Sequence, residues 1–316
     1  MPAPRALRSL SPVALAYGLL IVLVIAATIV NPAFVSLDNI RAQLIIGTII
    51  GTVAIGQTIL IIMGQIDLSV PWTITATGMM AAVLHGKGYG DLAAIASALA
   101  VGLAVGLVNA VGVAVFRIQS LVWTLAVNTT LQGLVLVGTN SEPPKAGVPA
   151  LARTVAVGNI GGVPWAALLW VALALTTIGV LRRTTFGRVV YATGISPLAT
   201  FFSGIDIRRT YLFGFVLSGL CGALGGLLLS GYASEAYLGM GNDYLLLPIA
   251  AVVIGGTSIL GGSGGYAGTI AGVLIMLTLQ STLSVAQIPQ GGKDIILGLL
   301  ILITIAAYGR RDTARA

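Results

Sequence analysis

Long apolar runs alternate with short polar, proline-rich or charged breaks along most of the chain. A helix needs about 20 mostly apolar residues to cross a bilayer. Such runs predict about ten transmembrane helices, at residues 13–30, 44–63, 70–84, 92–116, 120–138, 164–181, 211–231, 244–260, 266–285 and 294–308.

These runs are continuous rather than alternating in polarity, which favours helices over the strands of a closed barrel. Within a lipid-exposed segment, a helix satisfies its own backbone hydrogen bonds. Composition agrees, because 57% of the 316 residues are hydrophobic and 8% are charged, whereas a soluble domain carries about 25% charged residues. We therefore predict an all-α polytopic membrane protein and exclude a soluble globular one.

Basic residues gather on one side of the predicted topology. Ten spans place both termini on that side, together with 11 of the 16 Lys and Arg residues: Arg5, Arg8, Arg117, Arg182, Arg183, Arg188, Arg208, Arg209, Arg310, Arg311 and Arg315. Because cytoplasmic loops are rich in Lys and Arg, we expect cytoplasmic tails at residues 1–12 and 309–316. Residues 13–308 then form one transmembrane domain with a long cytoplasmic loop at 182–210. The net charge of +7 reports this orientation and no nucleic-acid partner.

The sequence predicts no catalytic, cofactor or metal site. None of the three lysines fits the phosphate-binding pattern GxxxxGK[ST], so any ATP hydrolysis is expected in a separate subunit. The single histidine, His85, has no second histidine with which to bind a metal. A membrane enzyme would need paired carboxylates or a histidine cluster, and the nearest acidic pair, Glu235 and Asp243, is interpreted as part of an external loop.

Polar side chains within the spans are the candidates for a solute pathway. Thr124, Asn128 and Gln132 follow one another at intervals of four residues and so share one helix face. Asp67 is the one acidic residue near hydrophobic depth. The full candidate set is Gln57, Asp67, Asn109, Thr124, Asn128, Gln132 and Gln280. Neutral amides and hydroxyls suit a neutral polar solute, but the same groups serve equally well as hydrogen bonds between helices.

Glycines recur at the small-xxx-small spacing that allows helix backbones to approach closely in lipid. The pairs are Gly47/Gly51, Gly102/Gly106, Gly222/Gly226, Gly264/Gly268 and Gly268/Gly272. We interpret these pairs as helix-packing sites.

The cytoplasmic loop contains the signals of a short helix. Ser196 is a suitable N-cap, Pro197 a suitable first residue, and Gly204 can end the helix in a left-handed conformation. These residues predict a helix of about two turns from Pro197 to Ser203. Two interpretations remain open: an interfacial helix on anionic lipid, or a lever that docks on a cytoplasmic partner.

Several ordered motifs resemble those of the ribose-type sugar permeases of bacterial ATP-binding-cassette (ABC) importers. They are Ala54–Thr58, Gly64–Val70, Thr184–Arg188, Tyr191–Gly194, Ser203–Ile205, Ile249–Ser258 and Gly261-Gly262. The resemblance extends from about Leu44 to Arg310. It implies the ABC importer permease fold, an inner-membrane location, and uptake of a monosaccharide or a similar small polar solute.

The same resemblance implies three partners: a second permease subunit in a homodimer or heterodimer, a cytoplasmic ATPase and a periplasmic solute-binding protein. It also implies that the loop contacts the ATPase, through Phe186, Gly187, Arg188, Ser196, Pro197, Leu198, Phe201, Phe202 and Gly204. The alternative is a stand-alone secondary carrier with two inverted five-helix halves. The scarcity of ionisable residues within the spans argues against that alternative.

Overall fold

The computed structural model describes residues 11–145, 147–289, 291–293, 295–300 and 302. Its elements are α1 (Pro12–Val30), α2 (Leu37–Ile62), α3 (Val70–Gly86), α4 (Asp91–Ala110), α5 (Ser120–Gly138), α6 (Ala150–Val157), β1 (Asn159–Ile160), β2 (Val163–Pro164), α7 (Trp165–Arg183), α8 (Thr185–Ile195), α9 (Pro197–Phe202), α10 (Ile207–Ala233), α11 (Leu247–Ile254) and α12 (Tyr266–Val285). Single turns at Pro32–Val35 and Asn242–Tyr244 are 3-10 helix, and a π-helical turn at Val111–Val115 continues α4. The two short strands pair antiparallel, Asn159 with Pro164 and Ile160 with Val163.

The expected all-α membrane fold is confirmed, but the expected number of spans is not. Seven helices of the described residues are long and apolar enough to cross a membrane: α1, α2, α4 with its π-helical turn, α5, α7, α10 and α12. The span expected at 70–84 is the 17-residue α3, preceded by the non-helical residues 65–69. The span expected at 244–260 ends early, because α11 has eight residues and a glycine-rich loop follows it. The span expected at 294–308 lies largely outside the described residues.

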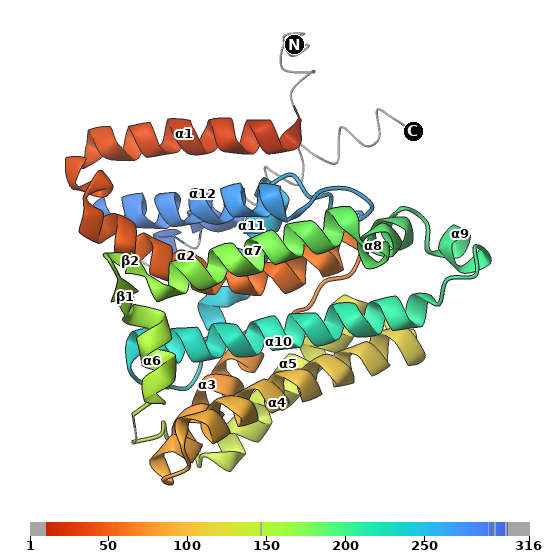
Figure 1. Cartoon of the computed structure of the whole chain (residues 1–316), viewed down its shortest axis with the longest axis horizontal. Coiled ribbons are helices and arrows are strands. Elements are labelled where there is room, and N and C mark those ends of the chain that lie inside the picture. The colour runs from red at the N-terminus through yellow and green to blue at the C-terminus, as the bar shows by residue number, and fades with distance from the viewer. Residues whose placement is uncertain (1–10, 146, 290, 294, 301, 303–316) are drawn as a thin grey trace.

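Helices α2 and α10 form the centre of the bundle. α2 packs against α7, α10, α11 and α12, and α10 packs against α2, α3, α4 and α6. Figure 1 shows α1 and α12 on one side of this centre and α3, α4 and α5 on the other. α2 is buried along most of its length, whereas α1 and α5 are peripheral and expose apolar side chains, as expected of helices that face lipid or a partner.

Glycine allows a close helix contact between α4 and α10. A Cβ atom at Gly102 would lie 2.5 Å from the carbonyl oxygen of Gly219, and one at Gly219 would lie 2.2 Å from that of Gly102. Gly106 has the same relation to Phe215, whose carbonyl oxygen would lie 2.7 Å from an added Cβ. The packing role predicted for Gly102 and Gly106 is therefore confirmed.

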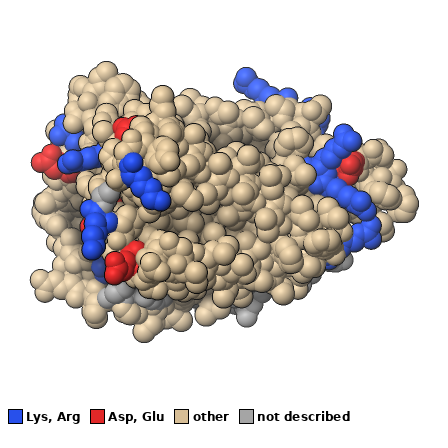
Figure 2. All heavy atoms as spheres, turned by 90° about the horizontal axis from the view of Figure 1, so that it is seen from below, with Lys and Arg blue, Asp and Glu red and all other residues tan. Residues whose placement is uncertain are grey.

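Charged residues lie at the two ends of the bundle (Figure 2). One end carries α8, α9 and the arginines Arg182, Arg183, Arg188, Arg208 and Arg209. The opposite end carries α6, β1 and β2 together with Asp38, Asp91, Glu142, Glu235 and Asp243 (Figure 1). A broad uncharged surface separates the two ends in Figure 2, which is the charge distribution of a protein that spans a bilayer.

Candidate functional site

The first candidate site surrounds the broken segment, which we define as residues 64–69 between α2 and α3. Non-helical backbone is tolerated at membrane depth where protein surrounds it and satisfies its polar groups, since each unsatisfied group costs several kcal/mol there. The broken segment meets this condition with side chains. From Ile66 to Ser69 its amide donors alternate between α5 and the interior of the bundle.

Two amides of the broken segment donate to α5. The amide of Ile66 donates to Ser120 Oγ (3.3 Å) and that of Leu68 to Thr124 Oγ1 (2.9 Å). One turn into α3, the amide of Trp72 donates to Asn128 Oδ1 (3.2 Å). Ser120, Thr124 and Asn128 are four residues apart, so successive turns of α5 present one acceptor each. We call these three residues the α5 ladder.

The amides of Asp67 and Ser69 bond toward the interior, whereas those of Gly64 and Gln65 bond back to the last turn of α2. The amide of Asp67 lies 3.5 Å from Gln57 Oε1 on α2, and that of Ser69 donates to Asp67 Oδ1 (2.9 Å). Gln57 Nε2 donates in turn to the Asp67 carbonyl oxygen (2.5 Å). The non-helical conformation is therefore held from both sides.

Asp67 is buried and accepts four hydrogen bonds through its carboxylate. Oδ1 accepts from the amide and hydroxyl of Ser69 (2.9 and 2.6 Å) and from Asn109 Nδ2 (3.3 Å). Oδ2 accepts from Ser218 Oγ on α10 (2.7 Å). Asn109 Nδ2 also donates to Ser69 Oγ (2.7 Å), while Asn109 Oδ1 is buried with no partner among the described residues. This cluster joins α4 and α10 to the broken segment, and through Gln57 it joins α2.

The structure thus brings together five of the seven candidate pathway residues: Gln57, Asp67, Asn109, Thr124 and Asn128. Gln132 lies one turn beyond Asn128 on the same face of α5 and is half-buried. Gln280 lies on α12, which packs on the opposite side of α2 from α5 (Figure 1). The residues that sequence reasoning missed are Ser69, Ser120 and Ser218. Ser120 stands four residues before Thr124, so its spacing could have identified it.

The second candidate site is the short helix α9 at the arginine-rich end. The Ser196 hydroxyl accepts from the amide of Ala199 (3.2 Å), and Pro197 occupies the first helical position. Gly204 follows the helix with φ of +80°. The predicted short helix is therefore confirmed, and it ends at Phe202.

Helix α9 presents apolar side chains to its surroundings. Leu198, Phe201 and Phe202 expose 66%, 62% and 78% of their surface. Arg188, Arg208 and Arg209, which flank them in sequence, are exposed as well, and Arg209 pairs with Asp206 at 3.2 Å. Exposed aromatic residues within a charged surface are typical of a protein contact.

Helix α8 fixes α9 to the bundle. The Thr184 hydroxyl caps α8 by accepting from the amide of Gly187 (3.2 Å). Gly187 packs against Leu181, where an added Cβ would lie 2.2 Å from the carbonyl oxygen. Phe186 packs edge-on against Phe213 of α10, with ring centroids 6.3 Å apart. Phe186 and Gly187, which the sequence predicted as ATPase contacts, therefore also hold α8 against the bundle.

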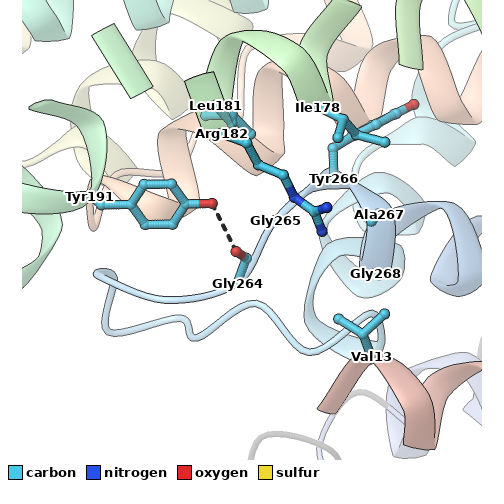
Figure 3. A pocket seen from close by; sticks show the side chains of 10 residues that line it. All are labelled: Val13, Ile178, Leu181, Arg182, Tyr191, Gly264, Gly265, Tyr266, Ala267 and Gly268. Carbon is cyan, nitrogen blue, oxygen red and sulfur yellow. Dashed lines mark hydrogen bonds between the residues drawn. The ribbon is translucent and has the colours of Figure 1, made fainter. Parts of the chain in front are cut away.

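A small cavity of about 50 Å³ lies where α8 meets the glycine-rich loop before α12. The Tyr191 hydroxyl donates to the Gly264 carbonyl oxygen across 2.9 Å, and the Arg182 side chain extends toward the start of α12 (Figure 3). Nearby, the amide of Gly262 donates to the carbonyl oxygen of Ile62 at the end of α2 (2.8 Å). Helix α8, the glycine-rich loop and the C-terminal end of α2 are thus in direct contact.

The fold and its charge distribution are those of a polytopic membrane protein. Residues 39–305 match the protein family described as "Branched-chain amino acid transport system / permease component". The chain is 33% identical over 293 residues to the ribose import permease protein RbsC of Haemophilus influenzae, covering 91% of this chain and 90% of that protein. It is 33% identical over 287 residues to RbsC of Bacillus subtilis (90% and 89%). It is 30% identical over 302 residues to the L-arabinose ABC transporter permease protein AraH of Azospirillum brasilense (94% and 87%). No solved structure matches the chain.

The chain therefore belongs to this family of ABC-transporter permease components. It is a multi-pass protein of the inner membrane, and it is not an enzyme itself because ATP hydrolysis belongs to a separate ATPase subunit. Membership in this family implies partnership with that ATPase and with a solute-binding protein. The alternative of a stand-alone secondary carrier is wrong.

Proposed function

We propose that the chain carries a monosaccharide inward across the inner membrane as one of two permease subunits. The full-length similarity to ribose and arabinose permeases carries this proposal. The described spans contain few charged side chains and several amides and hydroxyls, which suits a neutral polyhydroxylated solute. Uptake of radiolabelled ribose, challenged with unlabelled pentoses and hexoses, tests the substrate class. Failure of every monosaccharide to compete would contradict it.

In this proposal the arginine-rich end faces the cytoplasm, and both termini lie on that side. Residues 13–308 form one transmembrane domain, with 182–210 as its cytoplasmic loop. The opposite end, which carries Asp38, Asp91, Glu142, Glu235 and Asp243, faces the binding protein. The exposed apolar surfaces of α1 and α5 meet lipid or the second permease subunit.

Helix α9 is proposed to dock on the ATPase. A docking helix must transmit movement, and packing supplies a route: α9 joins α8, and Gly194 of α8 lies so close to Ile62 that an added Cβ would be 1.8 Å from the Ile62 carbonyl oxygen. Backbones in such contact shift together, because packed interfaces do not deform continuously. ATPase movement would thus reach the end of α2. Single cysteines at positions 198 to 202 are expected to crosslink to the ATPase in an active transporter, and no crosslink at any position would contradict the docking.

The polar face of α5 is proposed to line the solute pathway, with Asn128 and Gln132 as its half-buried members. No hydrogen bond of the described residues involves the Gln132 side chain, so Gln132→Leu removes polarity without breaking an internal contact. We expect it to lower uptake about two- to tenfold, which is the effect of losing one hydrogen bond to the solute. Asn128→Leu should lower uptake further, since it also removes the acceptor for the Trp72 amide.

Membrane abundance and ATPase association are measured in parallel with uptake. Leu134→Ala is the matched control, because Leu134 is on α5 but exposes 65% of its surface away from this face. Unchanged uptake in both polar variants, or loss of folded protein in both, would discard the pathway assignment in favour of interhelical hydrogen bonding.

Gly204 is expected to set the direction in which the chain leaves α9. An added side chain there meets no atom within 4 Å, so a substitution tests the backbone conformation alone. Gly204→Val should cost about 1 kcal/mol or more in the left-handed region and lower uptake about fivefold. Gly204→Asn, which tolerates this region, should retain most of the uptake. Equal uptake by the two variants would show that the left-handed turn is not needed.

A further inference from the structure

Among the described residues, the Asp67 carboxylate makes no hydrogen bond to α2 or α5. The backbone of the broken segment makes these bonds instead. The four hydrogen bonds of the carboxylate come from Ser69, Asn109 and Ser218, none of which lies on α5. The side chains of the α5 ladder in turn accept hydrogen bonds from the amides of Ile66, Leu68 and Trp72. The two sets of bonds alternate along one non-helical stretch of chain from Ile66 to Ser69, so loss of either set is expected to loosen the same stretch.

Helix α5 is held to the bundle in part by this arrangement. It is peripheral, with few buried side chains, and Ser120 and Thr124 are its two buried residues. Both are members of the ladder. The register of α5 against the bundle is therefore set in part by polar contacts to the broken segment, beside the apolar packing of Trp123 and Val135 on the core. The Trp123 indole also donates to the Val108 carbonyl oxygen (3.1 Å).

We propose that Asp67 is a positioning residue of the transporter. Its carboxylate holds the broken segment in its non-helical conformation, so that the amides of Ile66 and Leu68 bond to the α5 ladder and fix the helix that carries the proposed pathway face. This role rests on the proposed function, because α5 matters for transport only if its polar face lines the pathway. Asp67 itself needs no contact with the solute.

The role requires a hydrogen-bond acceptor rather than a negative charge, and this distinguishes positioning from direct action. In Asp67→Asn, the remaining oxygen can accept from Ser69 and Asn109, and the new NH2 can donate to Ser218, whose hydroxyl rotates to accept it. In Asp67→Leu, a side chain of similar size accepts nothing, and the amide of Ser69 and the Asn109 NH2 lose a partner. The two variants therefore separate the acceptor from the charge.

Amide hydrogen exchange of the purified transporter in lipid nanodiscs tests the proposal without requiring transport. We expect exchange of the peptide covering residues 64–72 to rise at least tenfold in Asp67→Leu and to stay within about twofold of the parent in Asp67→Asn, because exchange reports local opening. Thr124→Val, which removes the acceptor for the Leu68 amide, should raise exchange of the same peptide. Thr58→Val is the matched control: Thr58 is a buried hydroxyl of α2 that contacts Thr269 of α12, and its loss should leave residues 64–72 protected.

If Asp67→Leu does not fold, Ser218→Ala serves in its place, since it removes one of the four donors and should raise exchange of residues 64–72 less. Combined with Thr124→Val, either variant should raise exchange by less than the sum of the single effects, because both free one segment. Unchanged exchange of residues 64–72 in Asp67→Leu, or in both Ser218→Ala and Thr124→Val, would overturn the proposal.

Uptake by the same variants provides the second readout. Asp67→Asn should retain uptake within about threefold, and Asp67→Leu should lose most of it. Abolished uptake in Asp67→Asn with residues 64–72 still protected would overturn the proposal and assign the carboxylate a direct role in transport. Absence of sugar uptake in the parent transporter would contradict the proposed function and leave the exchange result intact, so the two failures are distinguishable.

Discussion

Phe201→Asp and Phe202→Asp are each expected to reduce sugar uptake about 30-fold while leaving the permease folded in the membrane. Both rings are exposed on α9, so neither contributes much to the stability of the chain alone. If the two rings fill a groove on the ATPase, replacing either with a carboxylate removes a hot-spot contact of about 2 kcal/mol or more. A loss of about 2 kcal/mol in binding free energy corresponds to a factor of about 30. Uptake, membrane abundance and ATP hydrolysis are measured on the same preparations.

Thr185→Asp is the matched control for these variants. Thr185 is exposed at the first turn of α8, where a carboxylate is favourable beside the helix N-terminus. It introduces the same charge at the same end of the bundle without altering α9. If α9 lay on lipid without a protein partner, the aspartates would weaken membrane contact but leave ATP hydrolysis coupled to transport. Normal uptake in both phenylalanine variants would end the docking proposal.

Gly219→Val is expected to remove nearly all folded protein. An added Cβ at Gly219 would lie 2.2 Å from the carbonyl oxygen of Gly102 and 2.9 Å from the amide nitrogen of Gly106. Backbone atoms cannot turn aside as a flexible side chain can, so α4 and α10 must separate. We expect a cost of about 3 kcal/mol or more and at least a tenfold lower yield of monodisperse protein in size-exclusion chromatography.

Gly179→Val provides the control, since a Cβ at Gly179 on α7 meets no atom within 4 Å. This variant changes the same residue type in a transmembrane helix and should retain its yield. Equal yields of the two variants would show that the close approach of α4 and α10 is not required for folding.

Local signals predicted α9 well, because Ser196, Pro197 and Gly204 act within a few residues of one another. Hydropathy predicted a break between the spans at 44–63 and 70–84, but it could not reveal how the broken segment is held, since two of its amide acceptors lie 54 and 56 positions away on α5. The helix expected at 70–84 begins at Val70 as predicted, but its 17 residues leave it shorter than the seven helices long enough to cross a membrane. At 244–260 the helix ends where the glycines begin.

Spacing alone also predicted some packing correctly and some incorrectly. Gly102 and Gly106 form a helix-packing site as expected, but their partner Gly219 could not be identified without the fold. Gly264 lies before α12 begins at Tyr266, so Gly264 and Gly268 do not form a pair on one helix. For the pathway residues, spacing correctly placed Thr124 and Asn128 on one face of α5. Spacing could not show that their side chains accept hydrogen bonds from the amides of Leu68 and Trp72, which are distant in sequence.

ATP-driven uptake into proteoliposomes tests the central claim most directly. The permease is reconstituted with its ATPase, and solute-binding protein, ATP and radiolabelled ribose are supplied on the appropriate sides. We predict uptake that requires the ATPase, ATP and the binding protein together and that falls about 30-fold in Phe202→Asp. Equal uptake by the permease alone under an imposed ion gradient, unaffected by the α9 variant, would contradict the account.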